Sequence, residues 1–345
     1  MVVGLIPRKR LSNIPAHLRE RHEYCFFLHD ECVRLLKEYE AAKANVVKIK
    51  FTDRKTAQKF EKIADTADGI EALRTTGYAE EAKRVIINQI TMAMVSDCLH
   101  HMFEGLKCFE KRKFIVALNL LRKPLKDNLL YLSWMLGDEE EFYREFTNGN
   151  PERLAHSRLG NFRASMFSKA ILQTGLGSMD GESLNDILFN RKNSSGLERL
   201  FQHAVHLITV QNIELKTSPE NFNFIFKRYT DDDIYQAVYE HLPYIVLFLS
   251  HVIVGLFNRM RNMDGGSYKA FYVRSTHAFF LIEDRNNGKS PELVDEALQR
   301  HIICAHCHKS LKATRLNMLK IMMTESFRCT FCRRNNEFPF SWIFD

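Results

Sequence analysis

The sequence lacks several features that define large classes of protein, and the first is a long membrane-spanning run. The apolar stretch Leu242 to Phe257 has no formally charged residue, but it covers only sixteen residues and includes Pro243, Ser250 and His251. A helix that crosses a bilayer needs about 20 apolar residues. We therefore expect a helix that is buried on all sides in the core, and no membrane span.

The first ten residues also lack the apolar run of a signal peptide. They carry three basic residues and no apolar stretch long enough for export, which predicts a cytoplasmic protein. Four of the eight cysteines fit this location, because they lie singly within helical patterns and indicate buried, reduced thiols rather than a disulfide framework. These four are Cys25, Cys32, Cys98 and Cys108.

The motifs of common enzyme classes are missing as well. The chain has no glycine-rich loop for phosphate groups, no G-x-S-x-G nucleophile turn and no H-E-x-x-H helix. It has neither an internal repeat nor a low-complexity stretch. These absences leave enzymatic activity open and favour a protein that is not an enzyme.

Hydrophobic residues recur at three- and four-residue steps through most of the chain, the period of helices that bury one face. We expect Pro124 to kink one of these helices. Short strands are expected within 221–226 and 268–282. The pattern predicts a mainly α-helical protein with minor β structure. The predicted helices cover about 15–44, 53–76, 79–108, 113–136, 197–211 and 231–262.

A polar run, Asp284 to Lys289, marks the expected domain boundary. It divides the chain into a helical body, residues 1–288, and a C-terminal module, residues 289–345. The sequence Ser290-Pro291-Glu292 follows the boundary and has the order of a helix start, a capping serine and then proline at the first helical position.

The strongest chemical signal is a pair of C-x-x-C motifs in the C-terminal module. Cys304 and Cys307 are followed, after twenty-one residues, by Cys329 and Cys332. A two-residue spacer lets the chain turn tightly enough for both sulfurs to face one point, and two such turns complete a tetrahedron around Zn²⁺. A closed four-thiolate site has no open coordination position, so it predicts a structural zinc ion.

Two other chemistries remain open for these cysteines. His308 makes the first motif read C-x-x-C-H, the attachment signature of haem, but this reading leaves Cys329 and Cys332 without a role. Four thiolates can also hold iron in a redox or iron–sulfur site. His306 and His308 could each replace a cysteine ligand, or lie on the surface beside the site.

The paired motifs resemble those of the zinc-ribbon and treble-clef families, over about Ile302 to Arg334. The resemblance implies a small zinc-binding module, and modules of these families often bind nucleic acid or proteins. Outside this segment the resemblance does not extend.

The positive charge of the chain is concentrated in the same segment. From residue 300 to residue 334 there are eight basic residues and one acid, Glu325, which equals the net charge of +7 of the whole chain. Zn²⁺ with four thiolates carries about −2, so compensation of the metal site explains only part of this excess. The basic residues are Arg300, Lys309, Lys312, Arg315, Lys320, Arg328, Arg333 and Arg334.

Such a basic surface on a rigid module is a candidate contact for the phosphates of DNA or RNA, or for an acidic protein. Apart from Arg300, all of these basic residues are candidate nucleic-acid contacts. We expect Phe327 and Phe331 to pack around the cysteines, and the apolar tail, residues 338–344, to dock on the module or the body.

Arg199 and His206, with six residues between them, fall on one face of a predicted helix. The spacing resembles the Arg-x4-6-His motif of HEPN-type helical ribonucleases, although Leu200 stands where that family usually has a polar residue. The resemblance implies a metal-independent ribonuclease of a defence or toxin type, with Arg199 and His206 as catalytic candidates. The stretch Gln89 to Leu136 also resembles bacterial helical proteins of abortive-infection type.

Three functional hypotheses follow from the sequence. The first is a zinc-binding protein with a helical scaffold or sensor body, whose basic module contacts nucleic acid or an acidic partner. The second is the HEPN-like ribonuclease, with the zinc module positioning RNA. The third is a structural zinc site that only locks the C-terminus onto the core of a protein-interaction protein. The sequence leaves the oligomeric state open.

Overall fold

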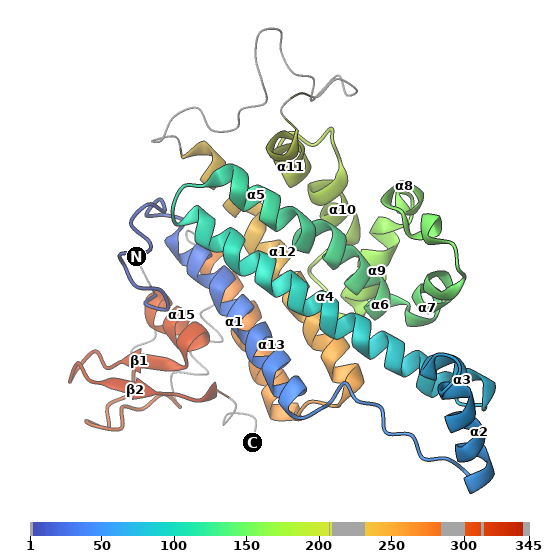
Figure 1. The fold of residues 1–345 in the computed structure, drawn as a ribbon. Helices are drawn as coiled ribbons and strands as arrows, with labels where there is room; N and C mark the ends of the chain where they lie inside the picture. Colours follow the sequence, from blue (N-terminus) through green and yellow to red (C-terminus); the bar gives the residue numbers. More distant parts are fainter. Residues whose placement is uncertain (1–2, 207, 209–231, 284–300, 312–313, 341–345) are drawn as a thin grey trace.

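The computed structural model describes residues 3–206, 208, 232–283, 301–311 and 314–340. These residues form a mainly helical protein with one small antiparallel sheet, in which β1 (Ser326–Arg328) pairs with β2 (Asn335–Glu337) (Figure 1). The mainly α-helical prediction is therefore confirmed. The α-helices are α1 (Arg19–Ala41), α2 (Arg54–Ala64), α3 (Gly69–Thr75), α4 (Ala79–Phe109), α5 (Phe114–Arg122), α6 (Leu129–Gly137), α7 (Glu139–Thr147), α8 (His156–Leu159), α9 (Arg163–Thr174), α10 (Gly181–Phe189), α11 (Leu197–Val205), α12 (Asp233–Met260), α13 (Gly265–Glu283) and α15 (Arg315–Thr324).

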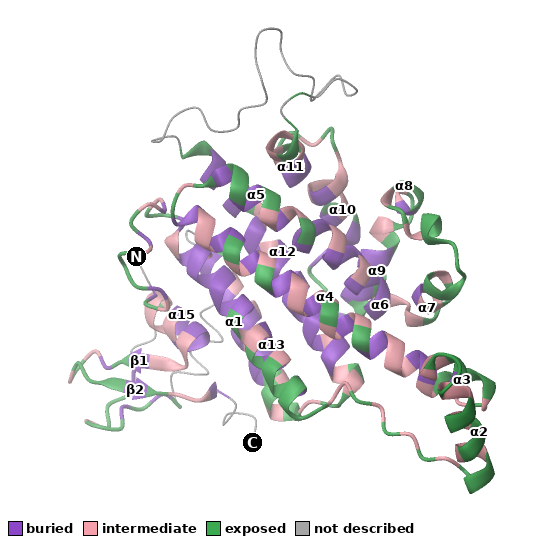
Figure 2. Ribbon diagram, viewed as in Figure 1, coloured by how far each residue is buried: buried purple, intermediate pink, exposed green. Residues whose placement is uncertain are grey.

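Helix α12 is the centre of the core and contacts α1, α6, α9 and α13 (Figures 1 and 2). By length and composition it could cross a membrane, but 78% of its most apolar window is buried inside the protein. This burial is that of a core helix, as the sequence predicts. His251 lies in its middle and bonds through Nε2 to the hydroxyl of Ser275 on α13, at 2.8 Å.

The kink expected at Pro124 takes the form of a π-helical turn, Lys123–Asn128, between α5 and α6. Proline has no N–H to donate and its ring collides with the preceding turn, so the chain widens at this point. Asn128 then bonds to the Asp97 carboxylate on α4, at 3.0 Å. This contact attaches the widened turn to the neighbouring helix.

Three predicted elements differ from the structure, and one of them, the helix expected over 197–211, ends at Val205. The strand expected within 268–282 is wrong, because this stretch belongs to α13, whose buried residues recur at helical spacing. The single helix expected over 53–76 is divided into α2 and α3, since Asp68 starts the second by accepting a hydrogen bond from the N–H of Ile70. The strand expected at 221–226, the helix start at Ser290 and the domain boundary at 288 lie outside the described residues.

The C-terminal module shares the core of the helical body. Helix α15 packs against α13 and α1, and its buried side chains, such as Met318 and Met322, belong to the same apolar cluster as the helices around α12. Buried Arg274 of α13 donates from Nε to the carbonyl oxygen of Met322, at 2.8 Å, and pairs with Glu31 of α1, at 3.1 Å. The last carbonyls of a helix have no partner within it, so Arg274 both caps α15 and ties it to the body.

The N-terminal segment is held against α4 by one carboxylate, that of Glu110. Arg10 donates to both its oxygens, and buried His22 lies 3.5 Å from one of them. Burial raises the pKa of Glu110, but the hydrogen bonds from His22 and Arg10 outweigh it and hold the pKa at about 2.

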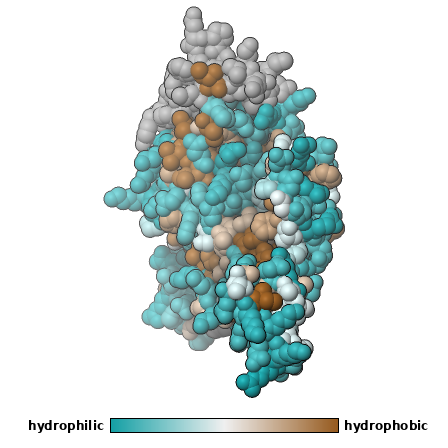
Figure 3. All heavy atoms as spheres, turned by 45° about the vertical axis from the view of Figure 1, so that its right-hand side comes forward, coloured by the Kyte–Doolittle hydropathy of each residue, from teal (hydrophilic) through white to brown (hydrophobic). Residues whose placement is uncertain are grey.

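The face of the molecule that Figure 3 shows is mainly hydrophilic. On the side that carries α7, α8 and α9, hydrophobic residues form separate patches within a polar surface (Figure 3). Helix α2, which has no buried residue, packs on α3 and extends away from the core (Figures 1 and 2).

We predict that Glu110→Gln lowers the free energy of unfolding by about 1–3 kcal/mol at pH 7, because Arg10 and His22 lose their charged partner. The folded pKa of Glu110 lies below its ordinary value, so its contribution is present above about pH 4.3 and is lost as the pH falls toward 2. Urea unfolding at pH 7 and pH 3 should therefore show a smaller difference between variant and wild type at the lower pH. An equal difference at both would contradict this account.

We also predict that Arg274→Gln destabilises the protein by about 2–4 kcal/mol, because a buried cation that serves two helices is removed. The matched control is Arg34→Gln. Arg34 pairs with the same Glu31, at 2.7 Å, but its side chain is 58% exposed, so its loss should cost below about 1 kcal/mol. Thermal unfolding of the two variants measures the contrast, and equal melting temperatures would argue against the role of Arg274.

Candidate metal centre

The four cysteines of the two C-x-x-C motifs come together at one point. Their sulfur atoms all lie within 4.8 Å of one another. Cys304 and Cys332 are 3.6 Å apart, as are Cys307 and Cys329. Sulfurs at the corners of a zinc tetrahedron lie about 3.8 Å apart, given Zn–S bonds of about 2.3 Å. The arrangement can hold a metal ion, as the spacing predicts.

The two motifs form turns of the same geometry. In the first, the N–H of His308 donates to the carbonyl of Cys304, and the N–H of Cys304 donates to the carbonyl of Lys309. In the second, the N–H of Arg333 donates to the carbonyl of Cys329, and the N–H of Cys329 donates to the carbonyl of Arg334. We call these turns, residues 304–309 and 329–334, the first and second knuckle.

Each knuckle turns through a residue with a left-handed backbone. His308 has a φ of 55° and Arg333 a φ of 64°. This conformation is uncommon for residues other than glycine, asparagine, aspartate and histidine, so Arg333 carries a small local strain. A four-thiolate metal site would hold both turns closed and offset that strain.

Backbone N–H groups point at the first sulfur of each knuckle. The N–H of His306 lies 3.4 Å from the sulfur of Cys304, and the N–H of Phe331 lies 3.4 Å from that of Cys329. Burial raises the pKa of Cys304, but hydrogen bonds from the N–H groups of Cys307 and His306 outweigh it and lower the pKa to about 6. The ionised sulfur that this favours is the form that binds metal.

The second cysteine of the second knuckle behaves differently. The N–H of Arg334 lowers the pKa of Cys332, but burial and the neighbouring thiols outweigh this and raise it to about 11. A metal ion supplies the positive charge that removes the remaining protons. Metal binding at this site should therefore release protons.

This geometry argues against two alternatives that the sequence leaves open, haem attachment and a histidine ligand in place of a cysteine. Haem attachment uses the sulfurs of one C-x-x-C pair, whereas here all four converge. His306 and His308 are both exposed, and neither belongs to the group of side chains that could hold the ion. The described residues form a cluster of four sulfurs that could hold a metal ion.

The basic residues of the module differ in how far they are exposed to solvent. Arg315 is directed inward and forms a short ion pair with the buried carboxylate of Glu20 on α1. It is therefore a docking residue, and the expectation of a nucleic-acid contact does not fit its position. Lys320 lies half-buried on α15, and Lys312 lies outside the described residues. The exposed group consists of Lys309, Arg328, Arg333 and Arg334.

The two phenylalanines beside the cysteines have different environments. Phe327 is buried, as predicted, but Phe331 is 55% exposed, so the expectation that it packs around the knuckle is wrong. The described part of the apolar tail, residues 338–340, docks as expected. Phe340 is buried, and its N–H donates to the Glu325 carboxylate, at 2.8 Å.

The pair Arg199 and His206 does not lie on one helical face. Helix α11 ends at Val205, and His206 follows it with an extended backbone, φ −114° and ψ 121°. Both side chains are exposed. The shared helical face on which the comparison with HEPN ribonucleases depends is therefore not formed.

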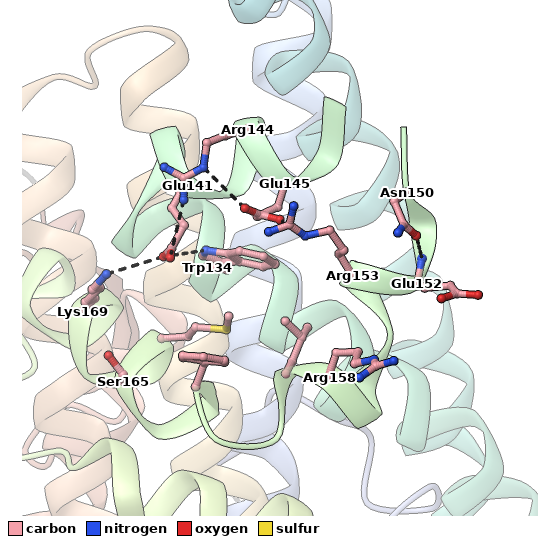
Figure 4. Close-up of a pocket in the computed structure, with 13 residues that line it drawn as sticks. Trp134, Glu141, Arg144, Glu145, Asn150, Glu152, Arg153, Arg158, Ser165 and Lys169 are labelled. Atoms are coloured by element: carbon pink, nitrogen blue, oxygen red, sulfur yellow. Dashed lines mark hydrogen bonds and ion pairs between the residues drawn. The ribbon is translucent and has the colours of Figure 1, made fainter. Parts of the chain in front are cut away.

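A separate pocket of about 570 Å³ lies beside Trp134, between α6, α7 and α9 (Figure 4). Its charges are nearly balanced, and several are already paired. Arg153 lies 2.7 Å from Glu145, and Lys169 lies 3.7 Å from Glu141. The pocket therefore lacks the strong positive field of the knuckles.

Comparisons of the chain with models of protein families, with curated proteins and with solved structures find no match. The likenesses to zinc-ribbon, HEPN and abortive-infection proteins thus remain resemblances of short motifs. The functional argument has to start from the metal centre and the surface around it.

We predict that metal removal exposes four thiols. Metal-bound sulfurs react slowly with a disulfide reagent such as DTNB, and burial raises the pKa of Cys25, Cys32 and Cys98, which keeps those thiols protonated. Adding a strong chelator to the folded protein should therefore add four fast-reacting thiols. The variant Cys108→Ser removes the half-exposed thiol outside the site and lowers the background. An unchanged count after chelation would contradict the metal site.

Proposed function

We propose that the four cysteines bind a single structural Zn²⁺ ion. Zinc accepts a closed four-thiolate site without any redox chemistry, and the spacing of the sulfurs suits its tetrahedral preference. The free energy of metal binding would then contribute to folding of the module. Its two strands have only three residues each. The ion has no open position, so its role is structural rather than catalytic.

We further propose that the surface of the knuckles binds nucleic acid, with the helical body as its scaffold. The observation that carries this proposal is the exposed group of four cations, Lys309, Arg328, Arg333 and Arg334. Among the described residues, no carboxylate lies within ion-pair distance of any of them. The acid of the segment, Glu325, is directed away from them and lies 3.5 Å from Arg274.

Unpaired cations on a rigid turn suit phosphate groups for two reasons. Phosphate contacts release counterions, which drives association, and a fixed backbone lowers the entropy that is lost on binding. The inward residues Arg274 and Arg315 have carboxylate partners, whereas the four exposed cations have none among the described residues. An acidic protein is the competing partner, and a purely structural zinc site is the competing role.

The HEPN-like ribonuclease remains an alternative with less support. It requires Arg199 and His206 to act together on the RNA backbone, and the end of α11 at Val205 separates them from a shared helical face. Cleavage of RNA that His206→Ala abolishes, with the fold intact, would favour it over the binding proposal.

We predict that the full chain contains one zinc ion and binds DNA or RNA with an affinity that falls steeply with salt. The double variant Arg333→Gln/Arg334→Gln should weaken binding and lower the slope of log K against log salt by about 1–2, because two phosphate contacts are lost. Fluorescence anisotropy with labelled single-stranded and duplex oligonucleotides measures both quantities.

The matched control is Arg315→Gln, which removes a guanidinium that is committed to Glu20. It should lower the melting temperature and leave the salt slope unchanged. Full-length variants are preferable to truncation before the module, because loss of α15 would expose the core face of α13 and α1. One zinc ion with no binding of any nucleic acid would overturn the proposal and leave a structural site or a protein-docking surface.

A further inference from the structure

The two knuckles carry planar side chains at equivalent positions. His306 is the third residue of the first C-x-x-C motif and Phe331 the third of the second, and both are exposed. The N–H of each donates to the first sulfur of its own knuckle, at 3.4 Å in both cases. The backbone that carries each ring is therefore held by a cysteine sulfur of its own knuckle.

A cation from the opposite knuckle accompanies each ring. The ammonium of Lys309, in the first knuckle, lies 4.6 Å from the centroid of the Phe331 ring in the second. A guanidinium nitrogen of Arg334, in the second knuckle, lies 3.5 Å from Nδ1 of His306 in the first. Lys309 and Arg334 are themselves equivalent, since their carbonyl groups accept the N–H of Cys304 and of Cys329.

The result is a crossed arrangement in which each knuckle contributes one ring and one cation. An exposed phenyl ring is unfavourable in water, and Phe331 remains 55% exposed although the neighbouring Phe327 is buried. An apolar protein partner would match a contiguous apolar patch, but the ammonium of Lys309 lies beside the Phe331 ring. Rings with adjacent cations are instead the pattern that binds stacked bases together with their phosphates.

Base stacking also distinguishes between forms of nucleic acid. In a duplex the faces of the bases are covered by their neighbours, so a surface ring finds only the edges and the backbone. In a single strand the bases can separate and each can stack on a side chain. Two rings that differ in chemistry but occupy equivalent positions can accept two bases of one strand.

We infer that the knuckle surface binds single-stranded nucleic acid, with Phe331 and His306 stacking on two unpaired bases and Lys309 and Arg334 contacting their phosphates. This inference rests on the proposed nucleic-acid function and specifies its substrate class. It also requires the metal, because the N–H to sulfur bonds that position both rings depend on the closed knuckles.

The test compares labelled homopolymeric single strands of deoxythymidine and uridine with a mixed-sequence duplex of equal length, on the zinc-loaded full chain. We expect the single strands to bind more tightly than the duplex. Phe331→Leu keeps an apolar side chain but removes the ring, so it should weaken single-strand binding by about 5- to 100-fold and leave the salt slope unchanged. Phe331→Trp should restore or strengthen binding.

The matched control is Phe162→Leu, which changes a phenylalanine that is 59% exposed on the helical body. It should leave binding unchanged, and zinc content and melting temperature verify that every variant is folded. Equal affinity for duplex and single strand, or a Phe331→Leu variant that binds as the wild type does, would overturn this inference while the proposed function stands. No binding of any nucleic acid by the wild type would overturn both.

Discussion

The convergence of four sulfur atoms is the constraint on which the C-terminal part of the structure depends. Two C-x-x-C motifs with twenty-one residues between them bring their sulfur atoms within 4.8 Å of one another. Between them lie one helix of ten residues and a strand of three, too little to bury a core of its own. The module therefore shares the core of the body through α15, and a metal ion bound to all four thiolates would offset the entropy lost when the loop between the two motifs closes.

The same convergence separates the charges of the module into two functional groups. Helix α15 and the residue that ends it, Glu325, lie against the body, where Arg274 and Arg315 find carboxylates. The knuckles lie at the other end of β1 and keep their cations in solvent. The zinc-loaded cluster would carry about −2, which lets several cations lie near one another without a carboxylate partner. The positive charge of the module is thus divided by position between Arg315, which is paired with the body, and the exposed cations of the knuckles.

The parts of this structure that could be predicted are those in which local chemistry decides the outcome. The C-x-x-C spacing fixes how sulfurs can meet, and the period of α4 and the apolar run of α12 identify them as helices. The prediction for 268–282 failed because aromatic and β-branched residues favour strands on average, whereas α13 is held by the packing of Phe271, Ala278 and Leu281 in the core. Tertiary burial overrode intrinsic preference at this point.

At the candidate site too, the sequence predicts what local spacing determines and misses what tertiary contacts determine. Sequence spacing identifies all four candidate ligands, but it cannot tell which lysines and arginines face solvent. Arg315 belongs to the docking interface only because Glu20, far away in sequence, approaches it in the fold. Phe331 and Phe327 are chemically identical and four residues apart, yet one is exposed and one is buried. The alternation of β1 and the turn that follows it decide this difference, and no composition rule would reveal it.

The shared core has a thermodynamic consequence for any ligand of the knuckles. Cys329 follows β1 directly, β1 follows α15 after Glu325, and α15 is tied to α13 through Arg274. A ligand that binds only the closed, metal-loaded knuckles must raise the apparent affinity of the site for metal by the same factor by which metal raises the affinity for the ligand. If closing of the knuckles and docking of α15 are linked through β1, such a ligand would also stabilise the docked α15. The helical body would then be coupled to the knuckle surface through α15 and its contact with Arg274.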